Sequence, residues 1–80
     1  MNFTLIGPTS SQTLEIKWLE VQTLQGNFVI KPGHAPMIII LAPNKEVSME
    51  LNDGATTVMT IAGGMLEVTR TDITLLLTHE

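Results

Sequence analysis

Histidine, serine and carboxylate side chains are the groups of this sequence that could do chemistry. The two histidines are His34, which lies between Pro32 and Pro36, and His79, near the end of the sequence. A metal site needs three or four converging ligands, and neither histidine belongs to a paired histidine or cysteine motif. His34 is therefore interpreted as a residue that orders a loop through hydrogen bonds, and no metal ligand is predicted.

Nucleophilic and acid–base catalysis also lack a suitable set of residues. Ser10, Ser11 and Ser48 have no base beside them and no glycine spacing typical of a nucleophile turn. Most of the 8 Asp and Glu residues alternate with apolar residues, which indicates a solvated strand face. Gly63-Gly64 precedes no Lys-Ser or Lys-Thr pair, so no phosphate loop is predicted. We expect no catalytic residue and no cofactor.

Charge and length exclude further classes of protein. The formal net charge is −4, and the 4 cations are scattered, whereas nucleic-acid binding needs clustered positive charge. The longest apolar run, residues 37–42, is far shorter than the roughly 20 residues of a spanning helix. The first residues carry no positively charged segment typical of a secretory signal. We therefore expect no nucleic-acid partner and no direct membrane insertion.

The elements that would position these residues are strands. Apolar and polar residues alternate over 13–18, 46–51 and 73–78, the period of a half-buried strand. The apolar phase slips by one residue at Leu19 and Val21, which predicts a β-bulge. Asp53-Gly54 predicts a hairpin with a type I′ turn, and Gly63-Gly64 a bulge or sharp bend.

These patterns predict a single all-β domain over residues 1–80. We expect a two-layer β-sandwich or flattened barrel of about eight to ten short, mainly antiparallel strands. Residues 37–42 are apolar at every position, so this strand is predicted to lie centrally with both faces covered. Trp18, the single tryptophan, fits either core packing or a half-exposed place at an interface.

Four segments then carry a resemblance to a known family. Residues 26–36 read Gly-Asn-Phe-Val-Ile-Lys-Pro-Gly-His-Ala-Pro, and residues 61–68 read Ile-Ala-Gly-Gly-Met-Leu-Glu-Val. Residues 72–76 follow as a terminal apolar strand, and residues 3–8 form an opening strand that ends in proline. In order and spacing, over nearly the whole chain, the sequence resembles the N-terminal β-sandwich of the epsilon subunit of F-type ATP synthase.

The resemblance implies a non-catalytic subunit of the F1 central stalk. Such a subunit couples the gamma subunit to the polar loops of the c-ring during rotary ATP synthesis driven by protons or sodium ions. It lies peripherally on the cytoplasmic face of the energy-transducing membrane. The residues that the resemblance assigns to the partner interface are Asn27, Lys31, Pro32, Gly33, His34, Ala35 and Pro36. It assigns Gly63 and Gly64 to a structural turn.

The sequence also departs from the family pattern. Asn27 stands where relatives often carry an acidic residue facing the c-ring, and Pro43-Asn44 stands where they commonly have Pro-Gly. Family members usually continue into a regulatory helical hairpin, whereas this sequence stops at Glu80. We therefore expect coupling without that regulation, and no nucleotide binding.

Two other classes remain as alternatives. A biotinyl- or lipoyl-like carrier module is also all-β and of this size, but it needs a lysine at a hairpin tip. The clearest tip here, residues 52–55, contains none. A small-ligand enzyme is the third class, for which no acid–base or nucleophile arrangement converges.

Overall fold

A computed structural model describes residues 1–78 as eight strands without a helix. The sequence prediction of an all-β sandwich of about eight strands is thereby confirmed. The strands are β1 (Asn2–Ile6), β2 (Ser11–Thr23), β3 (Gly26–Ile30), β4 (Met37–Ile40), β5 (Lys45–Leu51), β6 (Thr56–Ile61), β7 (Gly64–Val68) and β8 (Asp72–Leu77).

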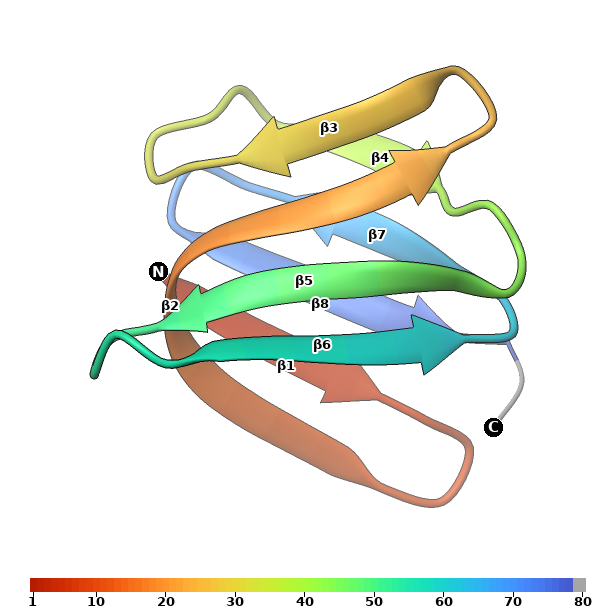
Figure 1. Cartoon of the computed structure of the whole chain (residues 1–80), viewed down its shortest axis with the longest axis horizontal. Coiled ribbons are helices and arrows are strands. Elements are labelled where there is room, and N and C mark those ends of the chain that lie inside the picture. Colours follow the sequence, from red (N-terminus) through yellow and green to blue (C-terminus); the bar gives the residue numbers. More distant parts are fainter. Residues whose placement is uncertain (79–80) are drawn as a thin grey trace.

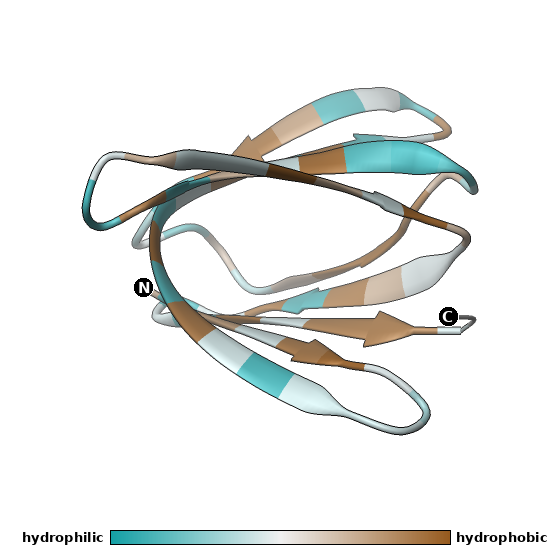
Figure 2. Ribbon diagram, turned by 60° about the horizontal axis from the view of Figure 1, so that its bottom comes forward, coloured by the Kyte–Doolittle hydropathy of each residue, from teal (hydrophilic) through white to brown (hydrophobic). Residues whose placement is uncertain are grey.

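The strands form two layers that share one long strand (Figure 1). One layer runs β4-β7-β8-β1, and the other contains β3, β5 and β6. The first part of β2 pairs with β1, and its second part pairs with β5 and β3. Figure 2 shows β2 curving from one layer into the other. We call these layers the β1 layer and the β5 layer.

Pairing is antiparallel everywhere except between β1 and β8, which run parallel. The register of β2 against β5 shifts between Ile16 and Trp18. The predicted bulge is therefore present, slightly earlier than the slip at Leu19 suggested. It turns Trp18 to the outer surface while Ile16 and Leu19 both stay fully buried. A bulge increases local twist, which suits a strand that passes from one layer to the other.

A single apolar core fills the space between the layers. Phe3, Leu66 and Leu75 reach it from the β1 layer, and Val21 and Met49 from the β5 layer, all without solvent exposure. The alternation in the sequence predicts the inward positions of Met49 and Leu75, because successive side chains of a strand point to opposite faces. No disulfide stabilises the core, since the chain has no cysteine.

The prediction that residues 37–42 form a central strand was wrong. Within residues 1–78, β4 lies at the end of the β1 layer, and β7 is the one strand that pairs with it. Its outward side chains, Ile38 and Ile40, are both 64% exposed. A strand with apolar side chains on both faces is suited to burial on both faces. The pattern alone does not say whether other strands of this chain bury it.

The turn after β5 also differs from the prediction. Asn52 and Asp53 both lack the positive φ that a type I′ turn requires, and only Gly54 has it, at 93°. The Gly54 amide donates to the carbonyl of Leu51 (2.9 Å), and the Leu51 amide donates to that of Ala55 (2.8 Å). The loop is thus a three-residue hairpin in which glycine follows an ordinary turn. The Asp53 carboxylate stabilises it by accepting from the Ala55 amide at 2.9 Å.

Candidate docking surface

The loop between β3 and β4, residues 31–36, is the segment that the sequence singled out. Lys31, Pro32, Ala35 and Pro36 are exposed, and His34 is half-buried. Backbone bonds order the loop internally, because the His34 amide donates to the carbonyl of Lys31 at 3.2 Å. The His34 Nδ1 atom lies 3.1 Å from the carbonyl oxygen of Ala35.

The same loop is tied to a distant part of the chain. The amide of Gly33 donates to the carbonyl of Arg70, in the turn between β7 and β8, at 3.0 Å. Gly33 has a φ of 83°, which favours glycine at this position. Two prolines and these bonds restrict the loop in the free protein, so little conformational entropy remains to be lost when a partner binds.

Asn27 lies at the other end of β3. It is exposed and pairs with Gln22 of β2, close to the β2–β3 turn. The loop begins four residues later, about 13 Å farther along the strand. Asn27, Val29 and Lys31 nevertheless alternate along one line, so they share the outer side of the β5 layer. The structure therefore arranges the predicted interface residues as a strip that leads into the loop.

Residues of β2 and β3 that the sequence analysis did not assign to the interface extend this strip. Trp18, Glu20, Val29 and Lys31 line a shallow hollow of about 280 Å³ on the outer side of the β5 layer. Alternation with Asn27 could have identified Val29. Glu20 could be placed here only once the pairing of β2 with β3 was known.

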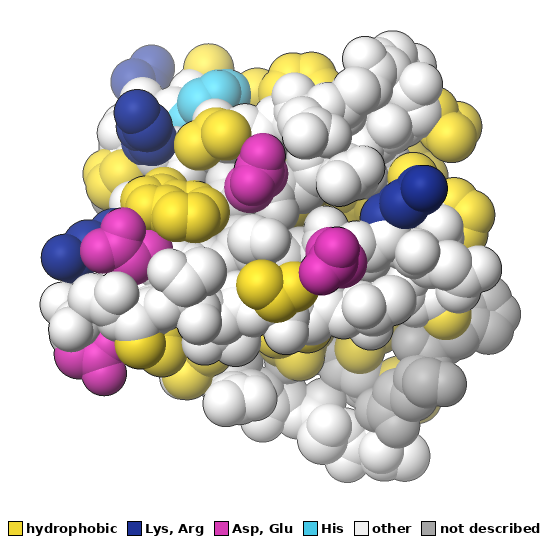
Figure 3. Space-filling view, in the orientation of Figure 1, with side chains coloured by type: hydrophobic (Ala, Val, Ile, Leu, Met, Phe, Trp, Pro, Cys, Tyr) yellow, Lys and Arg dark blue, Asp and Glu magenta, His cyan; other side chains and the backbone are white. Residues whose placement is uncertain are grey.

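Trp18 takes the half-exposed place of its two predicted alternatives. Its ring is half-buried on the outer surface, and its Nε1–H donates to Oε1 of Glu50 at 2.7 Å. The other carboxylate oxygen of Glu50 lies 3.4 Å from Nζ of Lys17. The tryptophan is thus fixed in orientation by a hydrogen bond, as is usual for a partly buried indole. Hydrophobic, acidic and basic side chains are interspersed on the face drawn in Figure 3.

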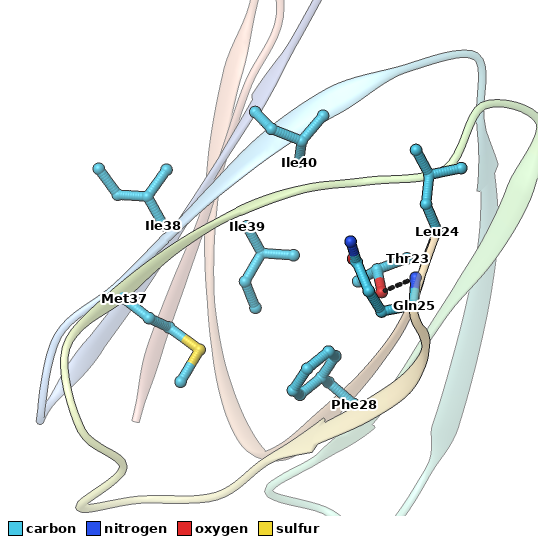
Figure 4. Close-up of a pocket in the computed structure, with 8 residues that line it drawn as sticks. All are labelled: Thr23, Leu24, Gln25, Phe28, Met37, Ile38, Ile39 and Ile40. Atoms are coloured by element: carbon cyan, nitrogen blue, oxygen red, sulfur yellow. Dashed lines mark hydrogen bonds between the residues drawn. The ribbon is translucent and has the colours of Figure 1, made fainter.

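A groove lies between β4 and the β2–β3 hairpin. Its volume is about 440 Å³, and its walls come from Thr23, Leu24, Gln25, Phe28 and residues 37–40. Figure 4 shows Met37 and Ile39 pointing toward Phe28, whereas Ile38 and Ile40 point to the other side of β4. The sequence did not predict this groove, because it exists only where the two layers fail to meet.

Gly64, one of the two predicted turn glycines, is buried at the start of β7. A Cβ atom there would lie 3.1 Å from both the Leu75 Cδ1 atom and the Leu76 carbonyl oxygen. The carbonyl of Gly63 accepts from the amide of Thr78 at 3.1 Å. The two glycines therefore lie where β7 and β8 approach each other closely.

Residues 1–78 show no group of three or more histidine, aspartate or glutamate side chains that could hold a metal ion. His79, the second histidine considered from the sequence, lies outside the described residues. No helix in this part of the chain has the length and apolarity that a membrane crossing needs.

Comparison with known proteins agrees with the family resemblance. Residues 3–79 match the family described as ATP synthase, delta/epsilon chain, beta-sandwich domain. The ATP synthase epsilon chain of Paracoccus denitrificans is 30% identical over 77 residues, which cover 95% of this chain and 51% of that protein. The epsilon chain of Rhodococcus erythropolis is 38% identical over 58 residues, 72% of this chain and 48% of that one. The chain thus spans about half the length of these relatives.

Solved structures show the same fold. A chain in the mitochondrial ATP synthase of Euglena gracilis, solved as OSCP, F1 and c-ring, superposes with a TM-score of 0.84 at 18% identity, covering 96% of this chain and 49% of that one. A chain in the central stalk and c-ring of the Tetrahymena thermophila mitochondrial enzyme gives 0.73 at 17% identity, covering 95% and 63%. Given the family match over nearly its full length, this chain belongs to the family of delta/epsilon-chain β-sandwich domains of ATP synthase.

Proposed function

We propose that this chain is a non-catalytic part of an ATP synthase central stalk that couples the gamma subunit to the c-ring. The observation that carries the proposal is the family match over residues 3–79, which includes the whole of the strip and the loop. In this proposal the domain lies peripherally on the cytoplasmic face of the membrane and acts during ATP synthesis driven by protons or sodium ions. Residues 1–80 serve as one domain, with no catalytic residue.

The loop over residues 31–36 is the proposed contact with the polar loops of the c-ring. Its restricted backbone and exposed Lys31 suit a contact that must carry force without rearranging. Asn27 adds a neutral hydrogen-bonding group at the far end of the strip. Since an amide replaces the acidic residue common in relatives, hydrogen bonds rather than an ion pair would form there.

The first test is direct association with the cognate gamma subunit. Titration of the purified chain with gamma should give saturable binding through a sizeable interface, measured by calorimetry. Absence of any association would refute the stalk assignment. The intact mass of the purified chain should equal that of the polypeptide, whereas an added prosthetic group would favour the carrier alternative.

The second test distinguishes a role of these residues in the contact from a role in the stability of the fold. His34→Ala and Asn27→Ala should lower ATP-driven proton pumping in the reconstituted enzyme, because both side chains are placed at the proposed interface. Both should change the free energy of unfolding by less than about 1 kcal/mol, because the Asn27 side chain is exposed and His34 is only half-buried. Glu46→Ala, an exposed change elsewhere on the β5 layer, is the control and should leave both properties intact. If the two interface variants unfold instead, these residues belong to the architecture and not to the contact.

A further inference from the structure

We infer that the outer side of the β1 layer is the surface that binds gamma, through an apolar band that crosses four strands and a basic side chain of gamma beside it. This assignment rests on the proposed function and gives gamma a surface separate from the strip and the loop. The apolar band consists of one residue from each of β4, β7, β8 and β1, namely Ile40, Met65, Leu76 and Ile6.

Strand pairing brings these four side chains into one row. Ile40 lies opposite Met65 in the β4–β7 pair, and Met65 lies opposite Leu76 in the β7–β8 pair. Leu76 in turn lies opposite Ile6 in the parallel β8–β1 pair. All four alternate with inward residues of their strands, so they point away from the core. Neighbouring strands lie about 4.8 Å apart, so the row is about 14 Å long.

The apolar band is open to solvent along most of this length. Ile40 is 64% exposed, Leu76 42% and Ile6 36%, and Met65 is half-buried between its neighbours. Ile38 widens the band at its β4 end, because it lies on the same side of β4 as Ile40 (Figure 4). Single exposed apolar residues are common in proteins, whereas contiguous apolar patches mark interaction sites.

The opposite layer shows how a solvated outer side differs. One row across the β5 layer reads Val29, Glu20, Ser48 and Val58. Its two apolar side chains are thus separated by a carboxylate and a hydroxyl group, whereas the row across the β1 layer is apolar on all four strands. The contrast indicates that the apolar band is a contact surface.

The charged side chains around the band are acidic. The next outward row reads Ile38, Glu67, Thr74, Thr4 and Thr13, and the row after it contains Asp72 and Glu15. Oε2 of Glu15 lies 3.6 Å from the amino group of Met1, whereas Glu67 forms no ion pair within residues 1–78. Glu67 follows Met65 by two residues in β7, so it borders the band directly.

The basic side chains of the sequence lie elsewhere. Lys17 is 3.4 Å from Glu50 of β5, Lys31 begins the loop, and Lys45 begins β5. Arg70 belongs to the turn between β7 and β8, at the end of this hairpin away from the band. A partner that covers the band therefore gains most if it places a lysine or arginine over Glu67.

This charge pattern disfavours two other occupants. Two copies that met over the same band would face each other's carboxylates without a basic group on either side. An anionic lipid surface would be repelled for the same reason. A protein that presents an apolar ridge of about 14 Å, between two and three helical turns, with a basic residue beside it fits the surface.

The position of the band indicates gamma as that protein. The strip with Asn27 and Lys31, which leads into the proposed c-ring contact, lies on the outer side of the β5 layer. The band lies on the outer side of the β1 layer, and the core separates the two (Figure 2). A coupling domain must hold both partners at once, so the side opposite the strip is available to gamma.

Calorimetric titration of gamma with the double variant Ile40→Thr/Leu76→Thr tests the band. Threonine suits a strand but removes most of the apolar contact. The dissociation constant should rise by roughly tenfold or more, because both side chains lie at the centre of the contact. Val58→Thr is the matched control, since Val58 is 50% exposed on the outer side of β6 in the other layer. It should change the dissociation constant by less than about twofold.

Reversal of one charge gives an independent measurement. Glu67→Lys should weaken binding of gamma by roughly fivefold at low salt, and the loss should shrink as salt screens the charges. Glu46→Lys, the same reversal at an exposed position of β5, should change binding by less than about twofold. Because Glu67 is fully on the surface, this test remains decisive if the double threonine variant fails to fold. Urea denaturation of each variant shows whether it is folded.

The outcomes separate this assignment from the stalk proposal. If gamma binds the parent chain and the variants of the band with equal affinity, the assignment is wrong and the stalk proposal stands. Equal losses in Val58→Thr or Glu46→Lys would place gamma on the β5 layer and also overturn it. A dimer of the parent chain that the threonine variant loses, measured by ultracentrifugation, would make a second copy the occupant. Absence of gamma binding by the parent chain itself would refute both proposals.

Discussion

At the scale of single residues, Asn44 and Gly64 show how the backbone restricts which side chains a position accepts. Asn44 has a φ of 57° and is the only residue other than glycine with positive φ among residues 1–78. Asparagine tolerates this conformation better than most other side chains, so Asn44 can adopt the backbone that the turn before β5 requires. Gly64 is favoured for another reason, because a Cβ atom there would lie 3.1 Å from both the Leu75 Cδ1 atom and the Leu76 carbonyl oxygen, closer than ordinary van der Waals contact.

Gly64→Ala is therefore expected to lower the free energy of unfolding by about 1–3 kcal/mol. The added methyl group would meet a backbone carbonyl oxygen at 3.1 Å, and a carbonyl in a strand pair cannot move as a side-chain end can. Urea denaturation followed by tryptophan fluorescence measures the change. Ser48→Ala, at a half-buried outward position of β5, is the control and should stay within about 0.5 kcal/mol of the parent. If Gly64→Ala leaves the free energy of unfolding unchanged, β7 and β8 can move apart locally to accommodate the methyl group.

At the scale of elements, β2 and β4 show that the position of a strand in the sheet determines how much an apolar side chain contributes to stability. β2 crosses from one layer to the other, and its Ile16 is fully buried where the register shifts. β4 is equally apolar, but its Ile38 is 64% exposed. Two isoleucines in strands therefore have different roles, one in the core and one on the exposed outer side of β4.

The same substitution should separate these roles. Ile16→Ala should cost about 2–5 kcal/mol of unfolding free energy, because a buried side chain is removed and a cavity remains. Ile38→Ala should cost less than about 1 kcal/mol in the isolated chain. Urea denaturation of both variants under identical conditions gives the comparison. Similar losses in the two variants would show that the outer side of β4 is covered within the chain itself.

At the scale of the whole molecule, one core joins the two layers. The buried cluster includes residues of every strand except β4, whose Met37 and Ile39 pack against it. Neither layer has a core of its own, so neither should persist when the other unfolds. The chain is also short, and a domain of this size buries only roughly 60–65% of its unfolded surface.

Unfolding should therefore be a single cooperative transition. Trp18 reports on the β5 layer through fluorescence, and circular dichroism reports on all strands together. The two signals should give the same midpoint and the same slope in urea. Separate midpoints would instead show that the layers unfold independently and that the shared core contributes little.

The sequence by itself determined the strands, most turns and the family. Alternation identifies the inward residues, and the order of segments 26–36, 61–68 and 72–76 places the chain among its relatives. Both signals are local, since side-chain direction and turn chemistry depend on near neighbours in the chain. The loop over residues 31–36 was proposed as a contact because residues 26–36 resemble the family's loop, and this assignment stays a prediction.

Only the tertiary structure decided which strand lies at an edge. The apolar pattern of β4 does not reveal which groups lie against its two faces. The sequence therefore predicted a central strand, whereas β4 lies at the edge of its layer. The groove beside Phe28 likewise exists because β3 and β4, although they follow each other in the chain, do not pair. Strand neighbours in this fold join residues far apart in the chain, as β1 and β8 do, and such pairings leave no local signal.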